Sequence, residues 1–215
     1  TILTAMDEAT RHRPVLLGLD VMKQPLLGWE HNMAFYGRGD GHRAFSMFLS
    51  TGSIGVGDLL DDPRLHSLMT PADYHARGVG MAWEGEGASD SLVLRGKTLI
   101  VENDARTWIA GEGPGRRSPL GAFMNLQEVE AGLLRNSAQC LSRGLLHYWM
   151  DVDGGWFDNE AIQEKIRIDK RLLEKALRRP RRETEHAIAF IIDDESPLYE
   201  NFTRGFQNIA VVRQR

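Results

Sequence analysis

Residues 96–111, GKTLIVENDARTWIAG, form the stretch of sequence that decides the fold. In it, the apolar residues 99–101 are followed at once by two carboxylates and a guanidinium within residues 102–106. A short apolar run of this kind is typical of a buried strand, which we predict over residues 97–102. The question is why a buried strand should end in so many charged groups.

Strands and helices alternate on both sides of this stretch. The predicted strands lie at residues 15–21, 65–69, 97–102 and 145–152, with a later apolar run at 186–196. Helices are predicted at residues 1–12, 43–50, 126–143 and 159–178, with a short helical turn at 91–95. Alternation of this type predicts βαβ units and a parallel sheet, and therefore an α/β protein.

The segment 126–143 has the strongest helix signals. Asn125 followed three residues later by Glu128 is typical of a capping box, and Gly144 is a plausible stop. The single cysteine, Cys140, lies on the apolar face of this helix, so we expect an inert buried thiol. With one cysteine, no internal disulfide is possible.

Composition limits the classes of function. The chain has 215 residues, 42% hydrophobic and 26% charged, which indicates a globular protein. A net charge of −4 gives no electrostatic reason to expect a nucleic acid or a membrane as partner. No apolar run approaches a membrane span, and no signal peptide is recognised, so the cytoplasm is favoured. No spacing of His, Cys, Asp or Glu predicts a metal site, and no cofactor is expected.

Polar or aromatic residues follow each of the first four predicted strands. In chain order they are Asp20, then Tyr74 and Arg77, then Glu102, Asp104 and Arg106, and finally Asp151, Trp156 and Asp158. The carboxyl ends of parallel strands meet at one edge of a sheet, where active groups are found. The sequence therefore predicts one shared site at this edge.

Glu102 is the sharpest candidate within that site. A carboxylate held rigidly at the tip of a strand suits a nucleophile or a general base. Asp104 and Arg106 could keep it ionised and aimed, because a nearby guanidinium favours the charged form of a carboxyl group. The alternative is that these three residues form a salt-bridged structural cap. Trp149 and Trp156 have faces suited to sugar rings, although packing in the core or at its rim is the commoner role of a single tryptophan.

Three stretches resemble a known family. They are SLMTPADYHARGVG (67–80), DSLVLRGKTLIVENDARTW (90–108) and LSRGLLHYWMDVDGGWFDN (141–159). Together with FYGRGDGHRAF (35–45) and HAIAFIIDDES (186–196), they resemble the clan A glycoside hydrolases of the β-galactosidase type that carry a trimerisation domain. The resemblance runs from about residue 14 to the end of the sequence.

The resemblance implies a fold and a reaction. Residues 1–182 would be the C-terminal half of a (β/α)8 TIM barrel, about strands five to eight, and residues 183–215 the start of a flavodoxin-like trimerisation domain. The family hydrolyses glycosides with retention of configuration, and Glu102 matches its nucleophile at the end of the seventh strand. The acid/base of the family would precede Thr1, so we expect the missing N-terminal half of the barrel to be a partner, without which this chain is inactive.

Substrate-binding residues also follow from the resemblance. Tyr74 and Arg77 would contact sugar hydroxyls, with a pair that stabilises their loop as the alternative. Trp149, Asp151, Trp156 and Asp158 would shape the sugar subsite. The expected partners are a carbohydrate substrate and, with a complete second domain, two further copies of the chain in a trimer.

Other functions fit the same residues. One is a carbohydrate-binding or scaffold protein without catalysis, which keeps the aromatic subsite. Another is an α/β hydrolase or lyase of a different kind, with Asp104 or Asp151 as its base. The third is purely structural, with the polar strand ends serving as ion pairs that cap the sheet.

Overall fold

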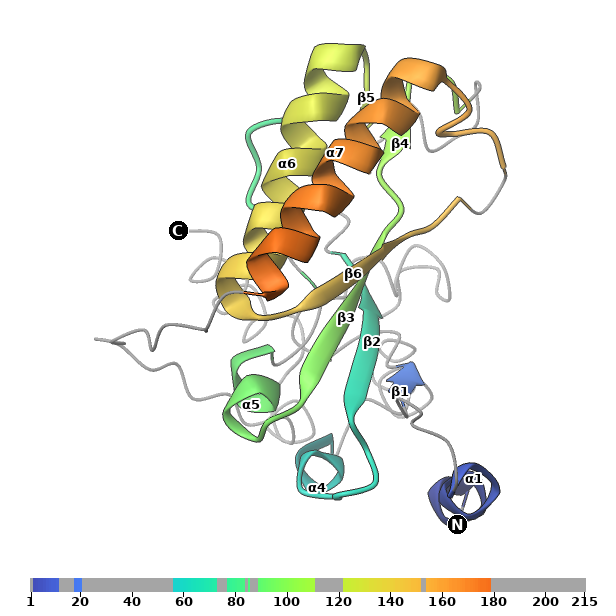
Figure 1. The fold of residues 1–215 in the computed structure, drawn as a ribbon, viewed down its shortest axis with the longest axis vertical. Helices are drawn as coiled ribbons and strands as arrows, with labels where there is room; N and C mark the ends of the chain where they lie inside the picture. Colours follow the sequence, from blue (N-terminus) through green and yellow to red (C-terminus); the bar gives the residue numbers. More distant parts are fainter. Residues whose placement is uncertain are drawn as a thin grey trace, which may run out of the picture.

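The computed structural model describes residues 2–11, 18–20, 56–72, 77–83, 85, 89–110, 122–151 and 154–178. Its elements, in chain order, are α1 (Ile2–Thr10), β1 (Gly18–Asp20), α4 (Val56–Leu60), β2 (Ser67–Pro71), α5 (Ser89–Leu94), β3 (Thr98–Asn103), β4 (Arg106–Thr107), β5 (Ala122–Phe123), α6 (Leu126–Arg143), β6 (Leu146–Trp149) and α7 (Glu160–Leu177). Figure 1 shows their arrangement, with α6 and α7 side by side.

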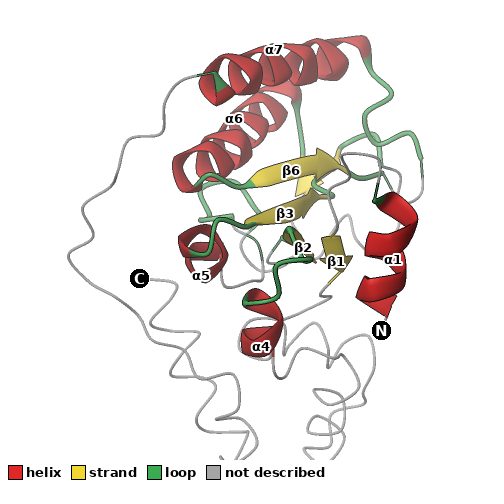
Figure 2. Ribbon diagram, turned by 60° about the horizontal axis from the view of Figure 1, so that its bottom comes forward, coloured by secondary structure: helices red, strands yellow, loops and turns green. Residues whose placement is uncertain are grey.

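A parallel sheet lies at the centre of the described residues. Its strand order is β1-β2-β3-β6, and each neighbouring pair runs parallel (Figures 1 and 2). The short strands β4 and β5 form a second parallel pair. The predicted α/β class with a parallel sheet is therefore confirmed. The four strands of the sheet overlap the four predicted ones, while β4 and β5 had no counterpart in the prediction.

Local sequence signals set the bounds of the two long helices. Asn125 caps α6 with its side-chain oxygen, which accepts from the Glu128 backbone N–H at 2.9 Å. Glu128 accepts from the Met124 N–H, one residue before the cap, at 2.8 Å, so the arrangement is close to the predicted capping box. Gly144 ends the helix in the left-handed conformation (φ 71°), which glycine adopts without steric cost. The predicted bounds of α6, residues 126–143, are confirmed. Helix α7 begins after the Asn159 cap, and its bounds differ from the predicted 159–178 by one residue at each end.

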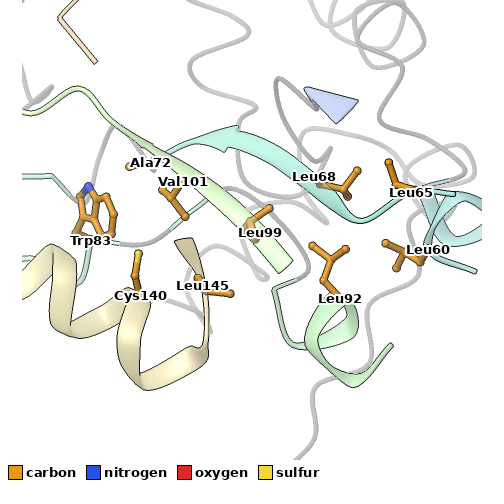
Figure 3. Close-up of a cluster of buried hydrophobic side chains, with 10 residues drawn as sticks. All are labelled: Leu60, Leu65, Leu68, Ala72, Trp83, Leu92, Leu99, Val101, Cys140 and Leu145. Carbon is orange, nitrogen blue, oxygen red and sulfur yellow. The ribbon is translucent and has the colours of Figure 1, made fainter. Parts of the chain in front are cut away.

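One face of the sheet packs against the helices. Leu99 and Val101 of β3 join a buried cluster with Leu92 of α5 and Cys140 of α6 (Figure 3). Cys140 is buried as predicted, and burial raises the pKa of its thiol to about 12. The full cluster comprises Leu60, Leu65, Leu68, Ala72, Trp83, Leu92, Leu99, Val101, Cys140 and Leu145.

A second cluster joins α6 and α7 to the carboxyl end of the sheet. It contains Ala105, Phe123, Val129, Leu133 and Ile162. Gly132 lets α6 pack closely against Phe123 of β5, because a methyl group at position 132 would overlap the Phe123 ring. The two clusters therefore fix the helices on the face of the sheet that carries Leu99 and Val101.

The opposite face of the sheet carries a different set of side chains. Side chains alternate along a strand, so Ile100 and Glu102 of β3 point away from the helix-covered face. Leu146 and Tyr148 of β6 are in register with them and share this second face. Neither of the two clusters includes any of these four residues.

Several predicted features fall outside the described residues. They are the helix at 43–50, the apolar run at 186–196, and the second domain at 183–215. The described part of the chain shows a four-stranded parallel sheet, and the barrel stays a prediction.

Candidate functional site

The carboxyl ends of β2, β3 and β6 meet at one edge of the sheet. Pro71, Glu102 and Tyr148 lie next to one another in the register of these three strands. Glu102 is the penultimate residue of β3, and its side chain is half-buried. The strand thus presents a carboxylate at its tip while its backbone is held by the neighbouring strands.

Tyr148 contacts the Glu102 carboxylate directly. Its hydroxyl donates a hydrogen bond to Glu102 Oε2 at 2.9 Å. A hydrogen bond donated to a carboxylate favours its ionised form and fixes its orientation. Tyr148 was not among the predicted site residues. Because side chains alternate along a strand, its position in the predicted strand 145–152 is the signal that could have pointed to it.

Asp104 pairs with Arg77, whereas the sequence predicted that it would act together with Glu102 and Arg106. It forms an ion pair with Arg77 through Arg77 Nη1, and the side chains of both residues are buried, at 0% exposure for Arg77 and 3% for Asp104. Arg77 also donates to the Ala72 carbonyl oxygen, from Nη2 at 2.8 Å and from Nε at 3.3 Å. The pair thereby ties the end of β3 to the end of β2. Arg77, which was predicted to bind sugar, is fully buried in this pair.

Arg106 lies against an aromatic ring. Its Cζ atom is 4.8 Å from the centroid of the Trp156 ring, a cation–π geometry. Trp156 is itself buried, with 1% of its surface exposed, and its backbone N–H donates to Asp151 Oδ2 at 2.8 Å. The side chain of Thr107 donates to the Trp156 carbonyl oxygen. Trp156, Asp151 and Arg106 therefore form one packed group at the carboxyl edge.

The remaining predicted binding residues differ in their exposure to solvent. Trp149 is half-buried and makes edge-on contacts with His147 and Phe157, at centroid distances of 5.2 and 5.9 Å. Asp158 is exposed. Tyr74 lies outside the described residues. The structure thus brings the predicted residues of β3 and β6 to one edge of the sheet, and the roles in sugar binding stay predictions.

A buried polar network lies behind the sheet, between α6, α7 and β6. The Ser137 hydroxyl donates to Asp169 Oδ2 and lies 3.2 Å from His147 Nε2. The hydroxyl stands between the carboxylate and the imidazole, whereas a nucleophilic serine needs the imidazole in the middle. Ser137 is also 2% exposed, so this group is a structural network rather than a second active site.

His147 makes stability depend on pH. Burial lowers the pKa of His147 to about 4, from 6.5. Between these two values the unfolded chain binds a proton that the folded chain does not, so stability falls as the pH is lowered. We expect the free energy of unfolding to drop by about 2–3 kcal/mol between pH 7 and pH 4.5 on this account. Burial raises the pKa of Asp169, which acts in the opposite direction and reduces the observed slope.

Urea unfolding at both pH values, for the wild type and His147→Gln, isolates the histidine contribution. The wild type should lose more stability than the variant over this interval. Equal losses in the two proteins would contradict the assignment.

Within the described ranges, no group of three or more His, Cys, Asp or Glu side chains is arranged to hold a metal ion. No helix in this part of the chain is long and apolar enough to cross a membrane.

Comparisons of the chain with protein-family models, with curated proteins and with solved structures gave no match. The fold and the site therefore define the class: an α/β protein with a parallel sheet and a polar site at its carboxyl edge. At the centre of that site is Glu102, held by Tyr148.

Proposed function

We propose that the chain is the C-terminal half of a retaining glycoside hydrolase barrel of the β-galactosidase type, with Glu102 as its nucleophile. One observation carries the proposal. Glu102 stands at the carboxyl tip of a parallel strand, half-buried, with one carboxylate oxygen held by Tyr148 and the side chain on the face away from the helices. This position, with the carboxylate oriented by a hydrogen bond, suits a glycosidase nucleophile.

The two faces of the sheet support a barrel. Parallel sheets are normally covered on both faces, and in a (β/α)8 barrel the helices cover only the outer one. Here Leu99 and Val101 pack against α5 and α6, whereas Ile100, Glu102 and Tyr148 share the other face. In the proposed barrel, that second face lines the interior. An N-terminal half from another polypeptide segment closes it.

The proposed reaction has two steps. In the first, Glu102 attacks the anomeric carbon of the sugar, and the bond to the leaving oxygen breaks as a second carboxyl group protonates that oxygen. In the second, the same carboxyl group takes a proton from water, and the water oxygen displaces Glu102 from the sugar. The two carboxyl groups must stand about 5–5.5 Å apart for this chemistry. The proposal assigns the second one to the N-terminal half of the barrel.

The neighbouring residues have supporting roles in the proposal. The Arg77–Asp104 ion pair and the Arg106–Trp156 contact make the edge of the sheet rigid. Tyr74, Trp149, Asp151 and Asp158 remain the proposed sugar contacts. Residues 183–215 are proposed to begin the flavodoxin-like domain through which three copies assemble.

A carbohydrate-binding or scaffold protein is the second candidate. The buried Arg77–Asp104 ion pair favours it, because Asp104, which was predicted to support the nucleophile, is paired with Arg77 instead. The two candidates differ in turnover. A binding protein should hold galactosides saturably without releasing product.

Covalent trapping tests the proposal. The complete polypeptide that contains this chain is incubated with a 2-deoxy-2-fluoro-β-galactosyl fluoride, which forms a long-lived glycosyl-enzyme with a retaining enzyme. We expect one label per chain, located by peptide mass spectrometry on Glu102. A label on a different residue, or hydrolysis of aryl galactosides without any label, would overturn the assignment.

Tyr148→Phe tests the support given to the nucleophile. The variant keeps the ring but removes a hydrogen bond to a charged group, a contribution of about 1.5–3 kcal/mol. We expect kcat/KM for an aryl galactoside to fall about 10- to 100-fold. Steady-state kinetics measures the change, and circular dichroism melting checks that Tm moves little. Unchanged kinetics in a folded variant would remove Tyr148 from the site.

A further inference from the structure

Arg135 of α6 binds the segment that precedes β3 in the chain. Its Nη1 donates to the carbonyl oxygens of Gly78 and Met81 at 2.5 and 3.0 Å, and its Nη2 donates to that of Arg77 at 2.9 Å. One guanidinium thus holds three backbone carbonyls of residues 77–81. Arg135 takes no direct part in the proposed reaction, and it lies on α6 rather than at a strand end.

The first connection from Arg135 to the site runs through Arg77. The backbone of Arg77 is held by Arg135, while its side chain is ion-paired with Asp104. Asp104 is two residues after Glu102 and directly follows β3. The Arg77 side chain also donates to the Ala72 carbonyl at the end of β2. A shift of residues 77–81 would therefore move both strand ends.

The second connection runs through two buried asparagines. Arg135 Nε donates to Asn136 Oδ1 at 3.0 Å, and Asn136 Nδ2 donates to Asn103 Oδ1 at 3.2 Å. Asn136 and Asn103 are each 0% exposed. Asn103 is the residue after Glu102, and its carbonyl oxygen accepts from the Met150 N–H at 3.1 Å, at the end of β6. Arg135 thus reaches both residues that follow the candidate nucleophile.

We propose that Arg135 is a positioning residue for Glu102, acting through the Arg77–Asp104 pair and the Asn136–Asn103 pair. The inference rests on the proposed function, since it concerns the same nucleophile. A planar guanidinium with five N–H donors can serve the three carbonyls and Asn136 at once, which a lysine ammonium with three donors cannot do. A displacement of about 1 Å at a reacting group can cost about 100-fold in rate, so small movements at the tip of β3 should be measurable.

The experiment compares Arg135→Lys and Arg135→Gln with the wild type in the complete polypeptide. The matched control is Arg143→Lys, in the last turn of the same helix, where the side chain contacts Ser89 Oγ instead. The rate of labelling of Glu102 by the 2-fluoro galactosyl fluoride is measured as a function of reagent concentration. We expect the maximal labelling rate to fall about 10-fold in Arg135→Lys and about 100-fold in Arg135→Gln. The half-saturating concentration should change less than about twofold, and Arg143→Lys should match the wild type.

Hydrogen exchange supplies a reading that does not depend on activity. Amides of residues 77–83 and 103–107 should exchange faster in both Arg135 variants, while those in the middle of α7 keep their wild-type protection. A global loss of stability would raise amide exchange throughout the protein. In the labelling experiment it would lower the fraction of molecules labelled at Glu102, rather than the labelling rate of the folded molecules. Arg135→Lys, which keeps the charge and the stem, serves where Arg135→Gln does not fold.

The outcomes separate the two proposals. Labelling of Glu102 at the wild-type rate in a folded Arg135 variant overturns the positioning role and leaves Glu102 as nucleophile. Failure of wild-type Glu102 to be labelled overturns the proposed function, and this inference with it. Slower labelling together with faster exchange at residues 103–107 supports both.

Discussion

Glu102→Gln is expected to lower kcat/KM for an aryl β-galactoside by at least about 1,000-fold, because an amide cannot form the glycosyl-enzyme. Glutamine keeps the volume of the side chain and can still accept the hydrogen bond that Tyr148 donates at 2.9 Å. We therefore expect the variant to fold and to bind sugar near the wild-type affinity. Steady-state hydrolysis and equilibrium binding of a galactoside inhibitor measure the two effects separately.

The control for this variant is Glu130→Gln. Glu130 lies on α6, where its side chain is 54% exposed and pairs with Lys165 of α7 at 2.7 Å. The rate of hydrolysis should stay within about twofold of the wild type, because exposed ion pairs contribute little to the free energy of folding. Hydrolysis by Glu102→Gln near the wild-type rate would end the case for Glu102. Activity on a non-sugar substrate that survives the substitution would favour the other hydrolase or lyase reading, with Asp104 or Asp151 as base.

Asp104→Ala should have the largest effect on stability. The substitution leaves the buried Arg77 guanidinium without its carboxylate, and breaking a buried ion pair from one side costs about 3–5 kcal/mol. We expect the free energy of unfolding, measured by urea titration, to fall by this amount with little change in the slope m. The loss is larger than the removal of a few atoms would suggest, because the remaining charge stays in a low-dielectric interior.

A double variant shows whether the charge is the cause. Arg77→Met combined with Asp104→Leu replaces the pair with apolar groups, and such replacements are often neutral or stabilising. The double variant should therefore recover much of the stability that Asp104→Ala loses. Asp61→Ala, which breaks an exposed pair with Arg95, should cost less than about 1 kcal/mol. A loss of similar size at both pairs would show that burial of Arg77 is not the reason.

Local signals in the sequence predicted much of the fold. Asn125 and Gly144 marked the ends of α6, and the prediction of a helix over residues 159–178 matched α7 to within one residue at each end. Caps act through bonds to backbone groups two or three residues away, so they can be read without the tertiary fold. The apolar run at 99–101 marked β3 for a similar reason, since a short run of apolar residues is also a local signal. Strand β2 began two residues later than predicted, at Ser67.

The gathering of polar residues at one edge of the sheet was also within reach of the sequence. Parallel strands separated by helices must all point the same way, so the residues after them meet. This rule placed Glu102, Asp104 and Asp151 at the same edge, and the parallel register of β3 and β6 brings the ends of these two strands together.

The sequence by itself determined the strand and helix pattern, the parallel sheet and the charged residues at the tip of β3. Only the tertiary structure decided their partners. Asp104 pairs with Arg77 rather than Arg106, Arg106 lies on Trp156, and Tyr148 holds Glu102. The physical reason is distance along the chain. A cap or a strand pattern depends on neighbours a few residues away. Each of these contacts instead joins segments from different elements, and a charge that the fold buries needs a partner that the fold also brings there.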